Sequence, residues 1–313
     1  MPVTARHKAA PVVQYSPMAY RRVSHGASLL EYGVVLGLVG LVSASILSSL
    51  GEQISEDFEY GADLLYSTVL DEDLDPSAFA IVVRTDTAFI YPKSGGTIQV
   101  DWGNKTANLT CGQDYLAGSE ISCVYPRLGT YTVAITGDMT SYGDPSGEVH
   151  NEAISRVLQW GDTGLTSLRA AFRGATRLTQ VPNFLPPSVT DIQSIFRDAV
   201  VFNDPSVALW DTSLITNMRS AFLNASAFDQ DLSTWDVSSV DSFYDTFKNA
   251  SALSTDLSGW DVSSATEMDG MFENASAFNS DLSGWCVESI TIQPPDFGTG
   301  SAIPAEPIWG SCP

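Results

Sequence analysis

This chain has aspartates that recur every 25 residues, and their type and spacing could suit ligand binding or acid–base catalysis. They form two columns, with Asp211, Asp236 and Asp261 in one and Asp231, Asp256 and Asp281 in the other. Stacked carboxylates could line a cation-binding or ligand-binding face, and two suitably spaced carboxylates hydrolyse glycosides. An aspartate at a fixed repeat position also holds a turn through its own backbone. Because no D-x-[DN]-x-[DN]-G loop is present and no motif singles out two acids, we predict turns, with no metal, no cofactor and no enzyme activity.

Histidine adds little further chemistry. His7 and His25 lie in the basic N-terminal segment, which leaves His150 as the one histidine of the chain that follows. A Ser–His–Asp arrangement would rest on His150 alone, and no G-x-S-x-G or comparable signature accompanies it. We therefore interpret His150 as a loop residue.

The most informative position is a single carboxylate in an apolar segment. Residues 27–50 form an apolar run whose one charged side chain is Glu31, and a leader with four cations and no acid precedes it. As a helix this run is long enough to cross a bilayer, and the cations before it predict that everything after Leu50 is exported. A charge buried in such a helix is costly and needs a functional reason. A plain membrane anchor or an uncleaved signal peptide is the alternative.

The sequence around Glu31 resembles the N-terminus of Flp/Tad-type IV prepilins over about residues 20–70, with Gly–x₄–Glu–Tyr in front of the apolar run. The resemblance implies that a prepilin peptidase cuts between Gly26 and Ala27. It also implies that Glu31, next to Tyr32, pairs with the free amine of a neighbouring subunit, which offsets part of the cost of burying both charges. The expected partners are other pilin subunits, the prepilin peptidase and the inner-membrane pilus assembly machinery.

The charge of the chain argues against nucleic acid as a partner. The sequence has 15 Lys and Arg against 37 Asp and Glu, a net charge of −22, and loss of the leader leaves about −26. Nucleic acids and anionic membrane surfaces are bound by basic patches. An acidic balance of this size fits a solvated extracellular surface.

The chain has four cysteines, none in a CxxC pair: Cys111, Cys123, Cys286 and Cys312. An exported chain meets oxidising conditions, so two disulfides are expected. We pair Cys111 with Cys123 and Cys286 with Cys312, because each pair falls within one region of the chain.

A β-rich segment follows a charged, proline-containing linker at residues 71–78. Runs rich in β-branched and aromatic residues predict strands at residues 79–85, 97–102, 121–125 and 130–136. They favour a small β-sandwich. V-D-W-G-N at residues 100–104 and G-T-Y-T-V at residues 129–133 resemble segments of PKD-type immunoglobulin-like domains, which implies such a fold for residues 79–145 and a spacer role.

The C-terminal half carries a 25-residue repeat. This step links two columns of aromatic residues, Trp210, Trp235, Trp260 and Trp285 in the first and Phe222, Phe247 and Phe272 in the second. The columns predict the core of an array in which each unit buries its apolar face only against its neighbours. The W-D-x-S and F-x-N-A motifs resemble BspA-type leucine-rich repeats of bacterial surface proteins. That resemblance implies a leucine-rich-repeat solenoid over residues 146–313 with a C-terminal disulfide cap.

Within a unit, the spacing predicts a short strand followed by a helix. Four apolar residues at steps of three, four and three mark one helical face: Val240, Phe243, Phe247 and Ala250. Ser264 and Glu267 match a capping box, and Asn274 suits a helix C-cap. The repeated Asn-Ala-Ser triplets also match the glycosylation sequon, but capping explains their recurrence.

Together these patterns predict a multi-domain α+β protein. Its expected parts are a leader (1–26), a transmembrane assembly helix (27–70), a linker (71–78), an immunoglobulin-like β-sandwich (79–145) and a leucine-rich-repeat solenoid (146–313). The predicted function is a pilin-like subunit, minor or tip-located, whose adhesive repeat head binds an extracellular protein or glycan. Its expected location is the bacterial inner membrane before assembly and the surface filament afterwards. The alternatives are a membrane-anchored adhesin outside any pilus and an exported carboxylate-dependent glycosidase.

Overall fold

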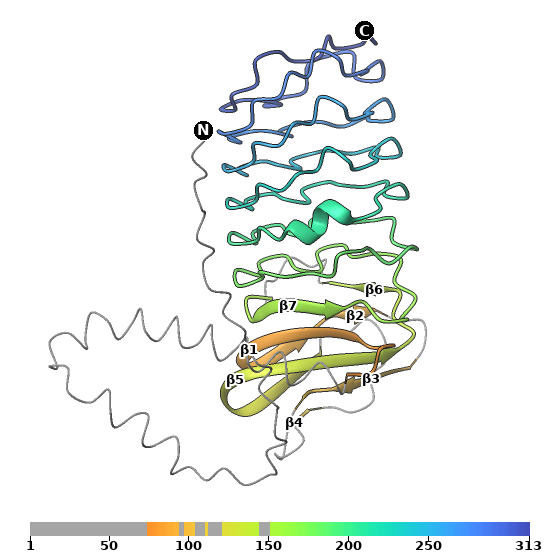
Figure 1. Cartoon of the computed structure of the whole chain (residues 1–313), viewed down its shortest axis with the longest axis vertical. Helices are drawn as coiled ribbons and strands as arrows, with labels where there is room; N and C mark the ends of the chain where they lie inside the picture. The colour runs from red at the N-terminus through yellow and green to blue at the C-terminus, as the bar shows by residue number, and fades with distance from the viewer. Residues whose placement is uncertain (1–73, 94–96, 104–109, 112–120, 144–150) are drawn as a thin grey trace, which may run out of the picture. The chain divides into compact units, whose positions relative to one another are not determined.

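A computed structural model of the chain describes residues 74–93, 97–103, 110–111, 121–143 and 151–313 (Figure 1). They hold an antiparallel sheet, followed by a series of turn-rich coils. The predicted leader and assembly helix, residues 1–70, lie outside the described residues. Within the described ranges, no helix is long and apolar enough to cross a membrane.

One five-stranded sheet forms the N-terminal part of this structure. Its strands are β1 (Phe79–Ile90), β3 (Ile98–Asp101), β4 (Thr110–Cys111), β5 (Ile121–Gly137) and β7 (Ile154–Gln159). The order is β3-β5-β1-β7, and β4 also pairs with β5. A separate two-stranded ribbon joins β2 (Pro92–Lys93) to β6 (Ser141–Tyr142). The runs predicted at 121–125 and 130–136 are one strand, β5, opposite an irregularity between Thr85 and Thr87 of β1.

The predicted immunoglobulin-like β-sandwich is therefore wrong, because the described residues form one five-stranded sheet and a short two-stranded ribbon instead of two packed sheets. Residues 79–83 of β1 are all almost fully buried, so both faces of this strand are covered. Aromatic rings join the sheet to the coils: Phe79 lies 4.6 Å from Tyr142 and 6.0 Å from Trp160, centroid to centroid. A single apolar core runs from the sheet into the coils.

The repeat region forms the coil stack, which we divide at the repeat positions into coil 1 (160–184), coil 2 (185–209), coil 3 (210–234), coil 4 (235–259), coil 5 (260–284) and coil 6 (285–313). Figure 1 shows these coils one above another. One isolated parallel bridge joins each of the first five coils to the next; Asn217 pairs with Ser242, and Ser242 with Glu267. Coil 2 also holds η2 (Pro205–Leu209), the one helical element among the described residues, and a 3₁₀ helix.

The predicted helix within each unit is also wrong. The expected helical face is fully buried, but its backbone forms consecutive turns. Alternate N–H groups donate to the next coil instead of to the residue four earlier: Phe247 N–H to the Met271 carbonyl at 2.9 Å and Asn249 N–H to Glu273 at 2.7 Å. Asp245 and Asn249 have positive φ, 52° and 61°, and a left-handed residue in every turn interrupts an α-helix.

The predicted fold class thus fails in its helical parts. Neither a long helix nor a leucine-rich-repeat solenoid is found among the described residues, whose regular elements are β apart from η2. The capping box is absent as well. The Ser264 hydroxyl donates to the Ser238 carbonyl at 2.6 Å, and Glu267 accepts from Ser242 at 2.9 Å.

Coil 6 closes the stack. It accepts hydrogen bonds from coil 5 at the carbonyls of Pro295 and Phe297, and Cys286 forms a disulfide with Cys312. The five prolines of this coil have no N–H group: Pro294, Pro295, Pro304, Pro307 and Pro313. Because they cannot donate to a further coil, this edge is poorly suited to strand addition.

Candidate functional site

The predicted N-terminal site residues lie outside the described residues. These are Gly26 and Ala27 at the processing junction and Glu31 and Tyr32 of the assembly helix; His150 lies outside them as well. Of the cysteines in the sheet, Cys123 is disulfide-bonded, and Cys111 faces it in the register of β4 and β5.

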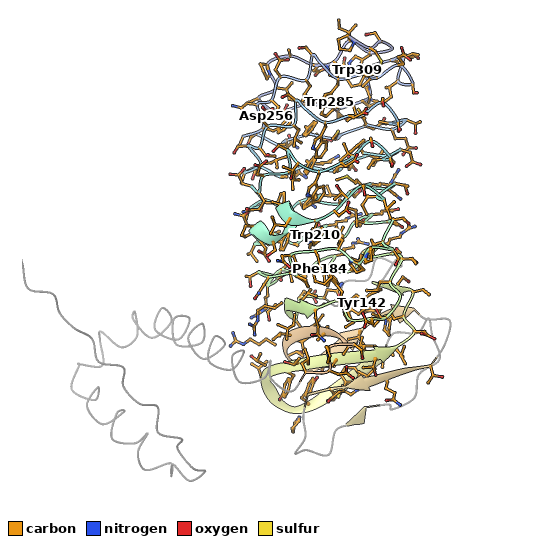
Figure 2. The ribbon with its side chains drawn as sticks, turned by 45° about the vertical axis from the view of Figure 1, so that its right-hand side comes forward. Tyr142, Phe184, Trp210, Asp256, Trp285 and Trp309 are labelled. Atoms are coloured by element: carbon orange, nitrogen blue, oxygen red, sulfur yellow. A yellow bond between two sulfur atoms is a disulfide. The ribbon has the colours of Figure 1, made fainter. Side chains whose placement is uncertain are left out.

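The residues of the two aromatic columns form the core of the coil stack. All seven repeat-core residues are buried, at 4% exposure or less, and Figure 2 shows Trp210 and Trp285 inside the stack. Each indole also donates to a carbonyl 28 residues earlier, near the end of the coil before the previous one: Trp235 Nε1–H to Val207 in coil 2 at 2.9 Å and Trp260 Nε1–H to Leu232 in coil 3 at 2.9 Å. These side chains are not available to a ligand.

The aspartate columns hold turns, as predicted. Asp211, Asp236 and Asp261 each accept from the backbone N–H two residues on, at 3.0–3.1 Å. The other column does the same: Asp256, at the edge of the stack in Figure 2, accepts from Ser258 N–H at 3.0 Å. That hydrogen bond, with one from the Ser258 hydroxyl, holds the pKa of Asp256 below its usual range. No group of His, Cys, Asp or Glu in the described part of the chain could hold a metal ion.

The asparagines of the repeat form a ladder rather than helix caps. Asn274 Nδ2 donates to Asn249 Oδ1 at 3.0 Å, and Asn249 Nδ2 donates to Asn224 Oδ1 at 2.7 Å. Asn224 Nδ2 then donates to the Asp198 carboxylate at 2.6 Å. Aligned amides strengthen one another, so this ladder fixes coils 2–5 in register.

On one surface, the basic, acidic and aromatic side chains differ from coil to coil. Two outward columns form it, which we call the variable face: Arg169, Gln193, Arg219, Tyr244 and Asp269 in the first, and Arg173, Arg197, Leu223, Lys248 and Glu273 in the second. The N–H groups and carbonyls of these segments bridge adjacent coils, so the backbone beneath the face is rigid. A rigid backbone with changing side chains is the arrangement by which repeat proteins present a binding surface.

The middle of the variable face is a preorganised cluster. The Arg219 guanidinium lies 3.8 Å from the centroid of the Tyr244 ring and 3.3 Å from the Glu267 carboxylate. Ser242 donates to the same carboxylate at 2.9 Å. Half-exposed Arg and Tyr held in fixed orientations are the residues most enriched in protein recognition sites.

Ion pairs flank this cluster on both sides. Arg173 and Arg197 approach one carboxylate of Asp198, at 3.9 and 3.4 Å, so this part of the face keeps an excess of positive charge. On the other side, Lys248 lies 2.6 Å from Glu273 and 3.6 Å from Asp245. The hydrogen bond to Glu273 raises the pKa of Lys248. Burial raises the pKa of Asp245, against the opposing charge of Lys248.

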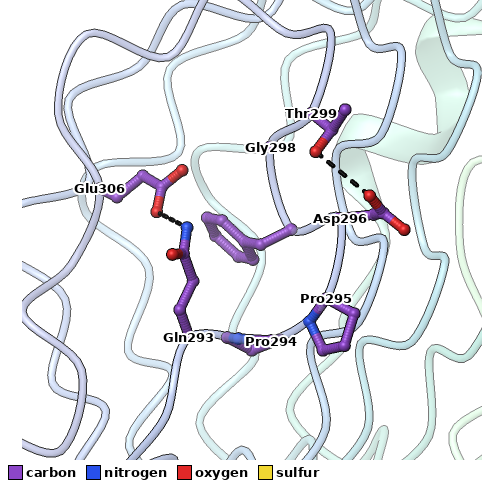
Figure 3. A pocket seen from close by; sticks show the side chains of 8 residues that line it. Gln293, Pro294, Pro295, Asp296, Gly298, Thr299 and Glu306 are labelled. Atoms are coloured by element: carbon purple, nitrogen blue, oxygen red, sulfur yellow. Dashed lines mark hydrogen bonds between the residues drawn. The ribbon is translucent and has the colours of Figure 1, made fainter.

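A second candidate is a shallow pocket of about 360 Å³ in coil 6, shown in Figure 3. Its two carboxylates are engaged with neighbours: Gln293 Nε2 donates to Glu306 at 2.7 Å, and Thr299 Oγ1 donates to Asp296 at 3.3 Å. No basic residue lines it. We therefore regard the variable face as the candidate site.

Sequence reasoning missed the variable face. Attention to the residues that repeat selects the core and the turns, whereas Arg219, Tyr244 and Asp269 occupy one repeat position with three different side chains. Variation at a fixed, outward position was the signal that could have identified the face.

The chain matches a family described as "Mycoplasma protein of unknown function, DUF285", at residues 147–208 and 190–303. No curated protein and no solved structure matches it. The match is not to a leucine-rich-repeat family, so the BspA-type assignment is wrong. The Flp/Tad pilin assignment is wrong on the same findings, because the match does not reach residues 20–70 and the described residues contain no long helix.

Proposed function

We propose a non-catalytic binding function for this chain, which belongs to the DUF285 family. The coil stack acts as a rigid recognition head, and the variable face is the surface that holds an extracellular protein or glycan. The observation that carries the proposal is the division of labour among repeat positions. Recurring Trp, Phe, Asp and Asn side chains hold the core, the turns and the ladder, whereas the variable face carries outward side chains that differ between coils.

Export and surface display remain predictions from the sequence, because they depend on residues outside the described part of the chain. Processing at Gly26, the role of Glu31 and filament assembly lose the resemblance that implied them, and these residues lie outside the described part of the chain. The acidic composition supports a solvated, extracellular setting for the head and argues against nucleic acid as its ligand.

The test is a binding screen of the full chain against glycans and extracellular proteins, followed by substitutions on the face. We expect Arg219→Ala or Tyr244→Ala to weaken a ligand by roughly tenfold or more, as for central residues of an interface. Arg156→Ala is the matched control, because Arg156 lies on β7, outside the face. A ligand that binds equally to all three variants would show that another surface is used. Hydrolysis of a glycan, lost on one Asp or Glu change, would instead favour the glycosidase alternative.

A further inference from the structure

Two charges at opposite ends of the variable face have no partner within the described residues. Arg169 in coil 1 is exposed, and Asp269 in coil 5 occupies the same column and is half-buried. Among the ion pairs of the described part, neither side chain takes part. The first column therefore begins with an unpaired cation and ends with an unpaired anion.

Other charged residues of the coil stack show the same change from positive to negative along the stack. Arg173 and Arg197 lie at the coil 1–2 end of the face, and Glu267 and Glu273 at the coil 5 end. After Lys248 the sequence contains no Lys or Arg, while nine Asp and Glu follow. The charge of the face thus changes sign along the stack, and like-signed neighbours within the chain cannot cancel it.

We propose that the variable face binds a second copy of this chain, with the two stacks side by side and antiparallel. The inference rests on the proposed binding function and names its partner. A two-fold axis in the plane of the face, perpendicular to the stack, lays each column against itself in reverse order. Arg169 of one copy then faces Asp269 of the other, and Arg173 faces Glu273, each contact occurring twice. The same operation sets Arg197 against Lys248, but both of these cations are already paired within their own chain, Arg197 with Asp198 and Lys248 with Asp245 and Glu273. A parallel arrangement would place like charges together, which disfavours it.

The centre of the face is compatible with this two-fold. Arg219 would lie near the axis opposite its own copy, but its charge is already balanced by Glu267 at 3.3 Å and its plane is covered by Tyr244. Leu223, the central residue of the second column, is only 7% exposed and presents no charge. A glycan or a simple acidic peptide would use the cationic end alone, and only a partner with the opposite polarity uses both ends.

Resonance energy transfer between donor-labelled and acceptor-labelled full chains measures this association. The wild-type chain is expected to associate at low salt and to lose association as ionic strength screens the contacts. Arg169→Glu alone and Asp269→Lys alone should each weaken self-association about tenfold, because two attractive contacts become repulsive. A mixture of the two variants should recover it, because Glu then faces Lys and Asp faces Arg. Arg156→Glu and Glu288→Lys, both outside the face, are the matched controls.

Two results would overturn the proposal. One is resonance energy transfer in both single variants that equals that of the wild-type chain. Association through residues 27–50 instead of the variable face would give this result. The other is a mixture that transfers no more than either variant alone, provided that each variant unfolds cooperatively like the wild type. If the face binds a glycan or another protein while the chain does not bind itself, the proposed function stands and this inference falls.

Discussion

Replacement of Phe247 by alanine tests how the coil stack is held together. Phe247 has no exposed surface, and its ring lies 5.4 Å from Phe222, 5.7 Å from Phe272 and 6.1 Å from Trp260. Removal of a buried Phe costs about 3–5 kcal/mol, from lost transfer energy and from the cavity that remains. The rings of Phe222 in coil 3 and of Trp260 and Phe272 in coil 5 pack against Phe247 from both sides, so they cannot fill the gap without moving away from their other neighbours. We therefore expect a cost in the upper part of that range.

Urea unfolding of the full chain, followed by tryptophan fluorescence, measures this cost, and Trp260 reports on the altered site directly. Phe184→Ala is the matched control, because Phe184 is 51% exposed and should lose less than about 1 kcal/mol. Hydrogen exchange should rise in coils 3–5 before it rises in β1 and β5, since each coil contacts only its neighbours. A loss below about 1 kcal/mol for Phe247→Ala, or a loss equal to that of the control, would refute the stacked-core reasoning.

Three further predictions follow from named contacts. The pKa values of five aspartates are lowered by Ser hydrogen bonds: Asp211, Asp231, Asp256, Asp261 and Asp281. The hydrogen bonds to these ionised aspartates stabilise the folded chain above the unfolded pKa of about 3.9, and this stabilisation is lost as pH falls through the lower pKa values of the folded state. Urea unfolding at a series of pH values should therefore show the free energy of unfolding falling in acid, and it should fall less steeply in Asp256→Asn. Cys286→Ser should cost about 3 kcal/mol and raise hydrogen exchange in coil 6 but not in the sheet. Asn249→Gly keeps the positive φ but loses two ladder bonds, at about 1–2 kcal/mol in urea unfolding, and Asn249→Ala should cost more through backbone strain.

The sequence predicted which residues are buried better than it predicted their backbone. Steps of three and four between Val240, Phe243, Phe247 and Ala250 identified a buried face correctly, but the same spacing fits a coil with a left-handed residue in every turn. The conflict was visible at Asp245 and Asn249, since both residue types tolerate positive φ. Hydrogen bonding between coils, which no local pattern contains, then decided against the helix.

Strand positions were predicted well, and the sheet arrangement was not. The runs at residues 79–85 and 130–136 lie in paired strands β1 and β5. The second layer of the expected sandwich is absent because coil residues such as Trp160 cover β1 instead. The candidate site could not be found from repeated motifs, because its members Arg219, Tyr244 and Asp269 are defined by the absence of repetition.

The proline-rich edge of coil 6 has a consequence for how such a protein can change in size. Because strand addition is disfavoured at that edge and the sheet occupies the other end, whole 25-residue units are more easily gained or lost between the sheet and coil 6. Each inserted unit would lengthen the variable face by one row and leave the sheet and coil 6 unchanged. The length and the side chains of the face could then change without exposing a strand edge that favours aggregation.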